Sequence, residues 1–205
     1  MPPGRSSSSS AGRSALVERG RVALVEEPGP DELVLTTERL RLRPWRVDEA
    51  PVLRPLWEER DPRVPPHRRP GPDGRPTVEE LGRWIREQRP GTLGWLAVER
   101  RDAGDVVGHC GLLAGERVPA GEPEIAFELL RHAWHRGLAT EAAAAVVGWA
   151  DRSGHRRLWA TVRRWNVASL RVLARVGFEP TDRVEPDDAH GDTLFLTRPM
   201  SPSVG

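Results

Sequence analysis

The residues with the clearest chemical meaning form a glycine-containing turn at 133–141, between a predicted strand that ends at Leu130 and a predicted helix. The first N–H groups of a helix have no partner inside it, and the helix dipole adds positive potential, so such a turn can bind an anion. Gly137 lets a phosphate approach the backbone, Ala139 keeps the next turn small, and Arg136 adds a cation. By itself the pattern fits a pyrophosphate cradle or an ordinary strand-to-helix connection.

Alternating and amphipathic segments around this turn predict the elements that must position it. The expected strands are 33–43, 93–98, 106–113, 125–130, 158–162, a short one after Phe178, and 192–197. The expected helices are 48–60, 77–88, 137–152 and 166–176. Asp48 and a capping box of Thr77 with Glu80 should start the first two helices, and Gly177 should end the last. This order mixes antiparallel hairpins with one parallel crossover, so the predicted class is α/β (α+β) with a mixed sheet.

Length and composition limit the classes of protein that fit. The 205 residues suit one domain at 33–199, a disordered or weakly structured tail at 1–32 and a frayed C-terminus at 200–205. The 31 basic and 30 acidic side chains nearly cancel, so we expect no nucleic-acid and no membrane partner. A single cysteine, Cys110, argues against a disulfide framework and a Cys-rich metal site. No secretory leader and no membrane span are recognisable, so we expect a cytoplasmic protein.

Further segments at a matching order and spacing are spread over most of the domain. They are 35–45, 107–112, 124–127, 134–142, 166–173 and 176–178. In these segments the chain resembles the GNAT acetyltransferases, most closely the RimJ/RimL-like branch that acetylates protein N-termini and small amines. The resemblance implies a mostly antiparallel sheet of about six to seven strands, splayed between its fourth and fifth strands and flanked by about four helices. It also implies transfer of an acetyl group from acetyl-CoA to a primary amine.

The resemblance assigns the coenzyme A site to particular residues. The family's phosphate signature is Gln/Arg-x-x-Gly-x-Gly/Ala, and Trp134 stands in its first position here. The strand at Glu128, Leu129 and Leu130 is expected to pair with the pantetheine amides. Asn166 should bond the pantetheine arm where the two strands diverge, although it also fits a plain helix N-cap. Main-chain N–H groups are expected to bind the pyrophosphate at His135, Arg136, Gly137, Leu138, Ala139 and Thr140.

Direct attack of an amine on a thioester needs a base, a donor for the oxyanion and a leaving thiolate. Many family members protonate the thiolate with a tyrosine, but this chain has none, and Leu173 stands at that position. Ser169 matches a serine with this role in part of the branch; the alternative is a small helix residue that packs near the cofactor. A thiolate with a pKa of about 8.5 leaves without a strong acid. The oxyanion donor is expected to be a main-chain N–H near Leu129 or Leu130.

Glu124 is the candidate base, because the start of its strand faces the acceptor side and a water can relay the proton. The alternative is an exposed acid at a strand end. Glu128 is in reserve on the same face. His109 is a third option, since an unperturbed histidine has a pKa of about 6.5, but a lone histidine in an apolar strand also fits a structural role. Cys110 is expected to lie in the core.

The acceptor is expected to be a peptide α-amine or a weakly basic small amine. Neutralising an α-amine at pH 7 costs about 1 kcal/mol, against about 4–5 kcal/mol for a lysine side chain. The loop 62–76 lies where the family shapes its acceptor site, and its four arginines could attract an acidic acceptor. A monomer or homodimer is expected. The other hypothesis is a non-catalytic module that binds acyl-CoA for regulation or assembly.

Overall fold

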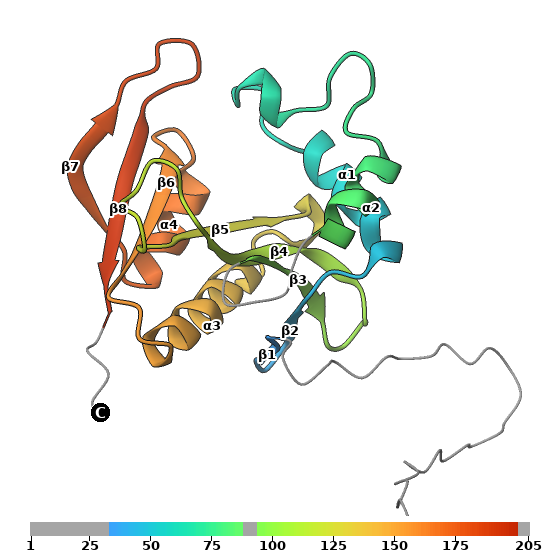
Figure 1. The fold of residues 1–205 in the computed structure, drawn as a ribbon, viewed down its shortest axis with the longest axis horizontal. Helices are drawn as coiled ribbons and strands as arrows, with labels where there is room; N and C mark the ends of the chain where they lie inside the picture. The colour runs from blue at the N-terminus through green and yellow to red at the C-terminus, as the bar shows by residue number, and fades with distance from the viewer. Residues whose placement is uncertain (1–32, 88–93, 201–205) are drawn as a thin grey trace, which may run out of the picture.

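A single mixed sheet carries the site in the computed structural model, which describes residues 33–87 and 94–200 (Figure 1). The predicted tail at 1–32 and the last residues, 201–205, lie outside this part. The strand order is β1-β2-β3-β4-β5-β6-β8-β7. The strands are β1 Leu35–Thr36, β2 Leu40–Arg43, β3 Gly94–Arg100, β4 Val106–Leu113, β5 Glu124–Leu129, β6 Arg157–Arg163, β7 Glu179–Glu185 and β8 Thr193–Pro199.

The predicted class is confirmed, and the described part has eight strands rather than about six to seven. The additional strand arises at the first predicted strand, 33–43. A turn closed by the N–H of Thr37 on the carbonyl of Leu40 divides it into the antiparallel pair β1 and β2. Only β5 and β6 run parallel among the paired strands of the described residues. That pair is the predicted crossover.

Four α-helices occur in the described residues, at α1 Ala50–Glu58, α2 Val78–Glu87, α3 Leu138–Arg152 and α4 Val167–Arg175. The predicted capping box of α2 is confirmed: the N–H of Thr77 donates to Glu80 at 2.8 Å, and the N–H of Glu80 donates to the Thr77 hydroxyl at 3.2 Å. The prediction that Asp48 caps the first helix is wrong. A 3-10 turn, Val47–Glu49, precedes α1, and the adjacent Glu49 makes no side-chain cap for α1.

Glu49 accepts from the N–H of Arg46 at 2.9 Å, in the capping box of the 3-10 turn, and also belongs to a buried ion-pair network. Arg43 donates to Glu49 at 2.6 and 2.9 Å and to Glu99 at 2.6 and 2.8 Å. Burial alone would raise the pKa of Glu49, but the hydrogen bonds from Arg43 and from the N–H of Arg46 bring it below its ordinary value. This network ties β2 and β3 to the start of α1. Its charges stay ionised because each is paired and hydrogen-bonded.

The helices cover opposite faces of the sheet (Figure 1). Helices α1 and α2 pack with Trp45, Ala97 and Leu130 in one apolar cluster. Helix α3 packs on the other face, where Cys110 is fully buried in the second and larger cluster. That placement agrees with the expected core role of Cys110, and burial raises the pKa of its thiol. No helix in the described ranges is long and apolar enough to cross a membrane.

Candidate active site

The predicted anion-binding turn has the required backbone conformation. His135 has φ 59° and Gly137 has φ 77°, and Gly137 is the N-cap residue of α3. The first bond inside the helix runs from the N–H of Glu141 to the carbonyl of Gly137 at 3.1 Å. The N–H groups of Leu138, Ala139 and Thr140 therefore have no acceptor inside the helix. All six residues predicted to bind the pyrophosphate lie on this one turn, and its free donors suit a diphosphate.

An ion pair between the partly buried Glu141 and the half-exposed Arg39 supports the turn. Glu141, on the first turn of α3, accepts from the N–H and the guanidinium of Arg39 at 2.9 and 2.7 Å, and from the Thr37 hydroxyl at 2.5 Å. Arg39 also donates to the carbonyl of Arg136 at 2.9 Å. Burial alone would raise the pKa of Glu141, but these hydrogen bonds lower it below the ordinary value. Sequence reasoning did not assign this role to Arg39, because its partner lies 102 residues away.

The splay predicted between two central strands is present. Strands β5 and β6 are paired only at Glu124 and Trp159. There the main-chain N–H of Trp159 donates to the carbonyl of Pro123 at 2.9 Å. The strands diverge from that point toward Leu129. A gap between two strands leaves main-chain donors and acceptors without a ladder partner, so an amide-bearing chain can pair there.

The pairing register decides which backbone groups of β5 face this gap. The N–H of Leu130 donates to the carbonyl of Val107 at 2.8 Å, so it points toward β4. Groups alternate along a strand, so the N–H groups of Phe127 and Leu129 point toward β6. The carbonyl of Leu129 accepts from the indole N–H of Trp134 at 2.6 Å. Of the predicted donors, Leu129 faces the gap and Leu130 does not.

The start of α4 lies across the gap. Asn166 caps this helix, since its side-chain oxygen accepts from the N–H of Ser169 at 3.1 Å. The Ser169 hydroxyl has no hydrogen-bond partner within 33–87 and 94–200. Leu173, at the position of the family's tyrosine, is buried in the core and carries no donor. Ser169 is thus the hydroxyl available near the position where a tyrosine would stand.

The three candidate bases lie on the face covered by α1 and α2, in distinct surroundings. Glu124, where β5 and β6 meet, accepts from the main-chain N–H of Thr161 at 3.0 Å and from the Thr161 hydroxyl. Glu128 is paired with Arg60 at 2.6 Å. His109 is opposite Glu128 in the register and is 4% exposed. The Glu128 carboxylate is thus bonded by Arg60. The second carboxylate oxygen of Glu124, in contrast, accepts no hydrogen bond from the described residues.

Burial lowers the pKa of His109 to about 4, so its imidazole is neutral at pH 7. The ring stacks on Trp95 with centroids 4.4 Å apart and planes at 13°. The His109 Nδ1 atom and the Trp95 indole N–H are buried without a partner in the described structure. His109 is therefore an uncharged group fixed by an aromatic neighbour.

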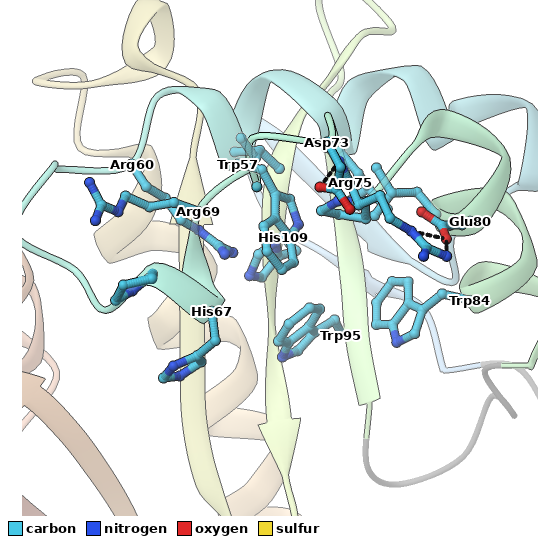
Figure 2. A pocket seen from close by; sticks show the side chains of 16 residues that line it. Trp57, Arg60, His67, Arg69, Asp73, Arg75, Glu80, Trp84, Trp95 and His109 are labelled. Carbon is cyan, nitrogen blue, oxygen red and sulfur yellow. Dashed lines mark hydrogen bonds and ion pairs between the residues drawn. The ribbon is translucent and has the colours of Figure 1, made fainter.

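A cavity of about 540 Å³ opens above this face, between α1, α2 and the loop 62–76 (Figure 2). This size is typical of small-molecule sites. Its walls are mainly apolar, from Leu53, Leu56, Trp57, Leu81, Trp84 and Trp95. Its polar members are Arg60, His67, Arg69, Asp73, Arg75, Glu80 and His109. The sequence placed the acceptor at the loop 62–76, but it did not single out the tryptophans of the wall as site residues.

No group of histidine, cysteine and acidic side chains in the described residues is arranged to hold a metal ion.

Comparisons with known proteins place the chain in a family. A family model described as an acetyltransferase (GNAT) domain matches residues 39–179. The uncharacterized N-acetyltransferase p20 of Bacillus licheniformis is 26% identical over 151 residues, which cover 71% of this chain and 82% of that protein. A solved putative GNAT-family acetyltransferase from Bordetella pertussis has a TM-score of 0.64 at 26% identity, over 81% of this chain and 99% of that one.

A RimL ribosomal L7/L12 α-N-protein acetyltransferase, solved in complex with coenzyme A, has a TM-score of 0.64 at 18% identity, over 82% of this chain and 98% of that one. The family match covers most of the domain, so the chain belongs to the GNAT acetyltransferase family. It is an N-acetyltransferase that uses acetyl-CoA, as the resemblance implied. The RimL structures share the fold of this chain at 18% identity, and the RimJ/RimL-like branch stays a prediction.

Proposed function

We propose that this N-acetyltransferase moves the acetyl group of acetyl-CoA to a primary amine, either a protein N-terminal α-amine or a small-molecule amine, by direct attack in a ternary complex. One observation carries the proposal. The cavity reaches His109 on β4, and the adjacent strand β5 borders the gap that suits a pantetheine chain. An acceptor in the cavity and a pantetheine chain in the gap would be separated by the width of one strand, about 5 Å.

The donor half of the site would bind through the backbone. The N–H groups from His135 to Thr140 would hold the pyrophosphate, and Arg136, exposed beside them, adds a cation. The edge of β5 at Glu128, Leu129 and Leu130 would flank the pantetheine arm, with Leu129 providing the free N–H. Asn166 would contribute its amide nitrogen, because its oxygen is already used in the cap. Acetyl-CoA supplies the thioester, and a RimL relative binds coenzyme A on the same fold.

The proposed chemical roles follow the placement of the side chains. Glu124 would take the proton of the amine through a water, using the carboxylate oxygen that Thr161 leaves free. The N–H of Phe127, which also faces the gap and lies nearer Glu124, would stabilise negative charge on the acyl oxygen, and that of Leu129 would remain for the pantetheine arm. The Ser169 hydroxyl would donate a proton to the sulfur as the thiolate leaves. Because a thiol has a pKa of about 8.5, this last step needs only a weak acid.

Thiol release tests the proposal. The full chain is incubated with acetyl-CoA and a panel of amines, and free thiol is measured together with the acetylated product. Acceptor-dependent release that follows ternary-complex kinetics supports the proposal. Ping-pong kinetics would contradict direct attack. Tight coenzyme binding without release, for every peptide and small amine in a broad panel, would contradict catalysis and favour the acyl-CoA-binding module.

A further inference from the structure

The charged groups that line the acceptor cavity are unequally neutralised. Arg75 is bonded to Glu80, and Arg60 is bonded to Glu128 on β5. Asp73 accepts from the N–H of Arg75 at 3.2 Å. Among the lining arginines, only the guanidinium of Arg69 makes no ion pair or hydrogen bond to the described residues. It is partly buried, so its charge is only partly compensated by water.

The position of Arg69 relates this cation to the reaction. Figure 2 shows Arg69 and Arg60 toward one end of the cavity, with Asp73, Arg75 and Glu80 toward the other. Arg60 bonds Glu128, so the first end is the one nearest β5 and the gap. An anion held by Arg69 would therefore lie close to the attacking amine.

The remaining walls are suited to an apolar group of aromatic size. Trp84 and Trp95 have ring centroids 5.1 Å apart at 53°, and Trp57 lies over the guanidinium of Arg60. Three indoles and three leucines can bury an apolar side chain, each Å² of which contributes about 25 cal/mol. A short polar peptide end would leave these walls in contact with water.

We infer that the acceptor is a free α-amino acid with a bulky apolar side chain, whose carboxylate binds Arg69 and whose side chain fills the tryptophan-walled cavity. This inference rests on the proposed function and narrows its acceptor class. The amine and the carboxylate of an α-amino acid are attached to the same carbon. The cation that binds the carboxylate should therefore lie at the end of the cavity nearest β5, as Arg69 does. A peptide N-terminus has no carboxylate there.

A matched series of amines tests the inference in the thiol-release assay. The acceptors are phenylalanine, phenylalanine amide, 2-phenylethylamine, glycine and a serine-initiated hexapeptide. We expect the highest kcat/KM with phenylalanine. Phenylalanine amide lacks the carboxylate charge, 2-phenylethylamine lacks the whole carboxylate group and glycine lacks the side chain, so each should be at least about 10-fold slower. Faster turnover of the peptide than of phenylalanine would overturn the inference while supporting acetyl transfer. Absence of release with all acceptors would contradict the proposed function itself.

The Arg69→Gln variant tests the carboxylate contact. A hydrogen bond to a charged group predicts a loss of about 10- to 100-fold in kcat/KM for phenylalanine. The activity with 2-phenylethylamine should remain within about two-fold, because that amine has nothing for Arg69 to bind. Arg83→Gln, on the exposed side of α2, is the matched control and should change neither value. An equal loss with both amines in Arg69→Gln, at unchanged coenzyme A affinity, would overturn the role of Arg69.

Discussion

The two halves of the candidate active site are built from different chemical groups. On the donor side, the gap between β5 and β6 and the turn before α3 present main-chain N–H groups. On the acceptor side, the cavity under α1, α2 and the loop 62–76 presents side chains, chiefly indoles and guanidinium groups. Backbone donors depend on conformation and persist when side chains change. The turn before α3 illustrates this, since His135 and Gly137 have positive φ with Trp134 in the first position of the signature. The acceptor cavity has no such protection, so substitutions there should change the substrate.

The largest expected effect concerns the proposed base. Glu124→Gln keeps an oxygen that can accept from the N–H of Thr161 but loses the negative charge. We expect kcat to fall by about 100- to 10,000-fold with coenzyme A affinity unchanged, because general base catalysis contributes about that much. Steady-state kinetics and calorimetry measure the two quantities. Glu179→Gln, exposed on β7, is the control. A variant with normal kcat would remove Glu124 from the mechanism and direct attention to His109.

The second prediction concerns stability on the acceptor side. The pKa of His109 is about 4 in the folded chain and about 6.5 when unfolded, so the unfolded state gains a proton first as the pH falls. The free energy of unfolding therefore keeps its full value above about pH 6.5. It falls by about 3 kcal/mol in total as the pH is lowered to about 4. Urea unfolding at pH 7.5 and pH 4.5 should show this loss in the unmodified chain. His109→Phe, which can still stack on Trp95, should lose less; equal losses in both proteins would refute the account of His109.

The third prediction concerns the backbone of the donor side. Gly137 has φ 77°, and a branched residue there is strained by about 1–3 kcal/mol. Gly137→Val should therefore weaken coenzyme A binding by about 10- to 100-fold, as measured by calorimetry. Gly154→Val is a closely matched control, because Gly154 has φ 76° and open space around it at the other end of α3. Equal weakening of coenzyme A binding in both variants would contradict a specific role of the Gly137 turn.

The smallest expected effect comes from a side chain that only supports the donor turn. Arg39→Gln removes the ion pair with Glu141 and the bond to the carbonyl of Arg136. The guanidinium is about half exposed, so we expect coenzyme A affinity to fall by only about two- to five-fold. Titration calorimetry at low salt would resolve this change. A loss as large as that of Gly137→Val would mean that Arg39 itself contacts the ligand, which would blur the distinction between the two halves.

Local features were the ones that the sequence could predict. The Gly137 turn, the Thr77 capping box and the hairpin of β3 and β4 each depend on residues that are close in the chain. The splay between β5 and β6 and the family followed from the resemblance and not from the residues alone. The cap predicted at Asp48 does not form. The neighbouring Glu49 bonds Arg43 on β2, which in turn bonds Glu99 on β3, and such distant contacts could not be foreseen from the local sequence.

Features that need the register or distant contacts were out of reach. Leu129 and Leu130 were equivalent candidates until the bond from Leu130 to Val107 showed which N–H faces the gap. The ion pair of Arg60 with Glu128 joins residues 68 positions apart. The tryptophan wall combines α1, α2 and β3, so no local pattern marked it as a cavity.

Amide hydrogen exchange with and without coenzyme A tests most directly whether the donor side binds through its backbone. We predict that the ligand slows exchange at the amides of residues 135–140 and at Leu129, with no change in α2. Protection that is absent from residues 135–140 despite saturating ligand would contradict the account, because the diphosphate would then be bound elsewhere.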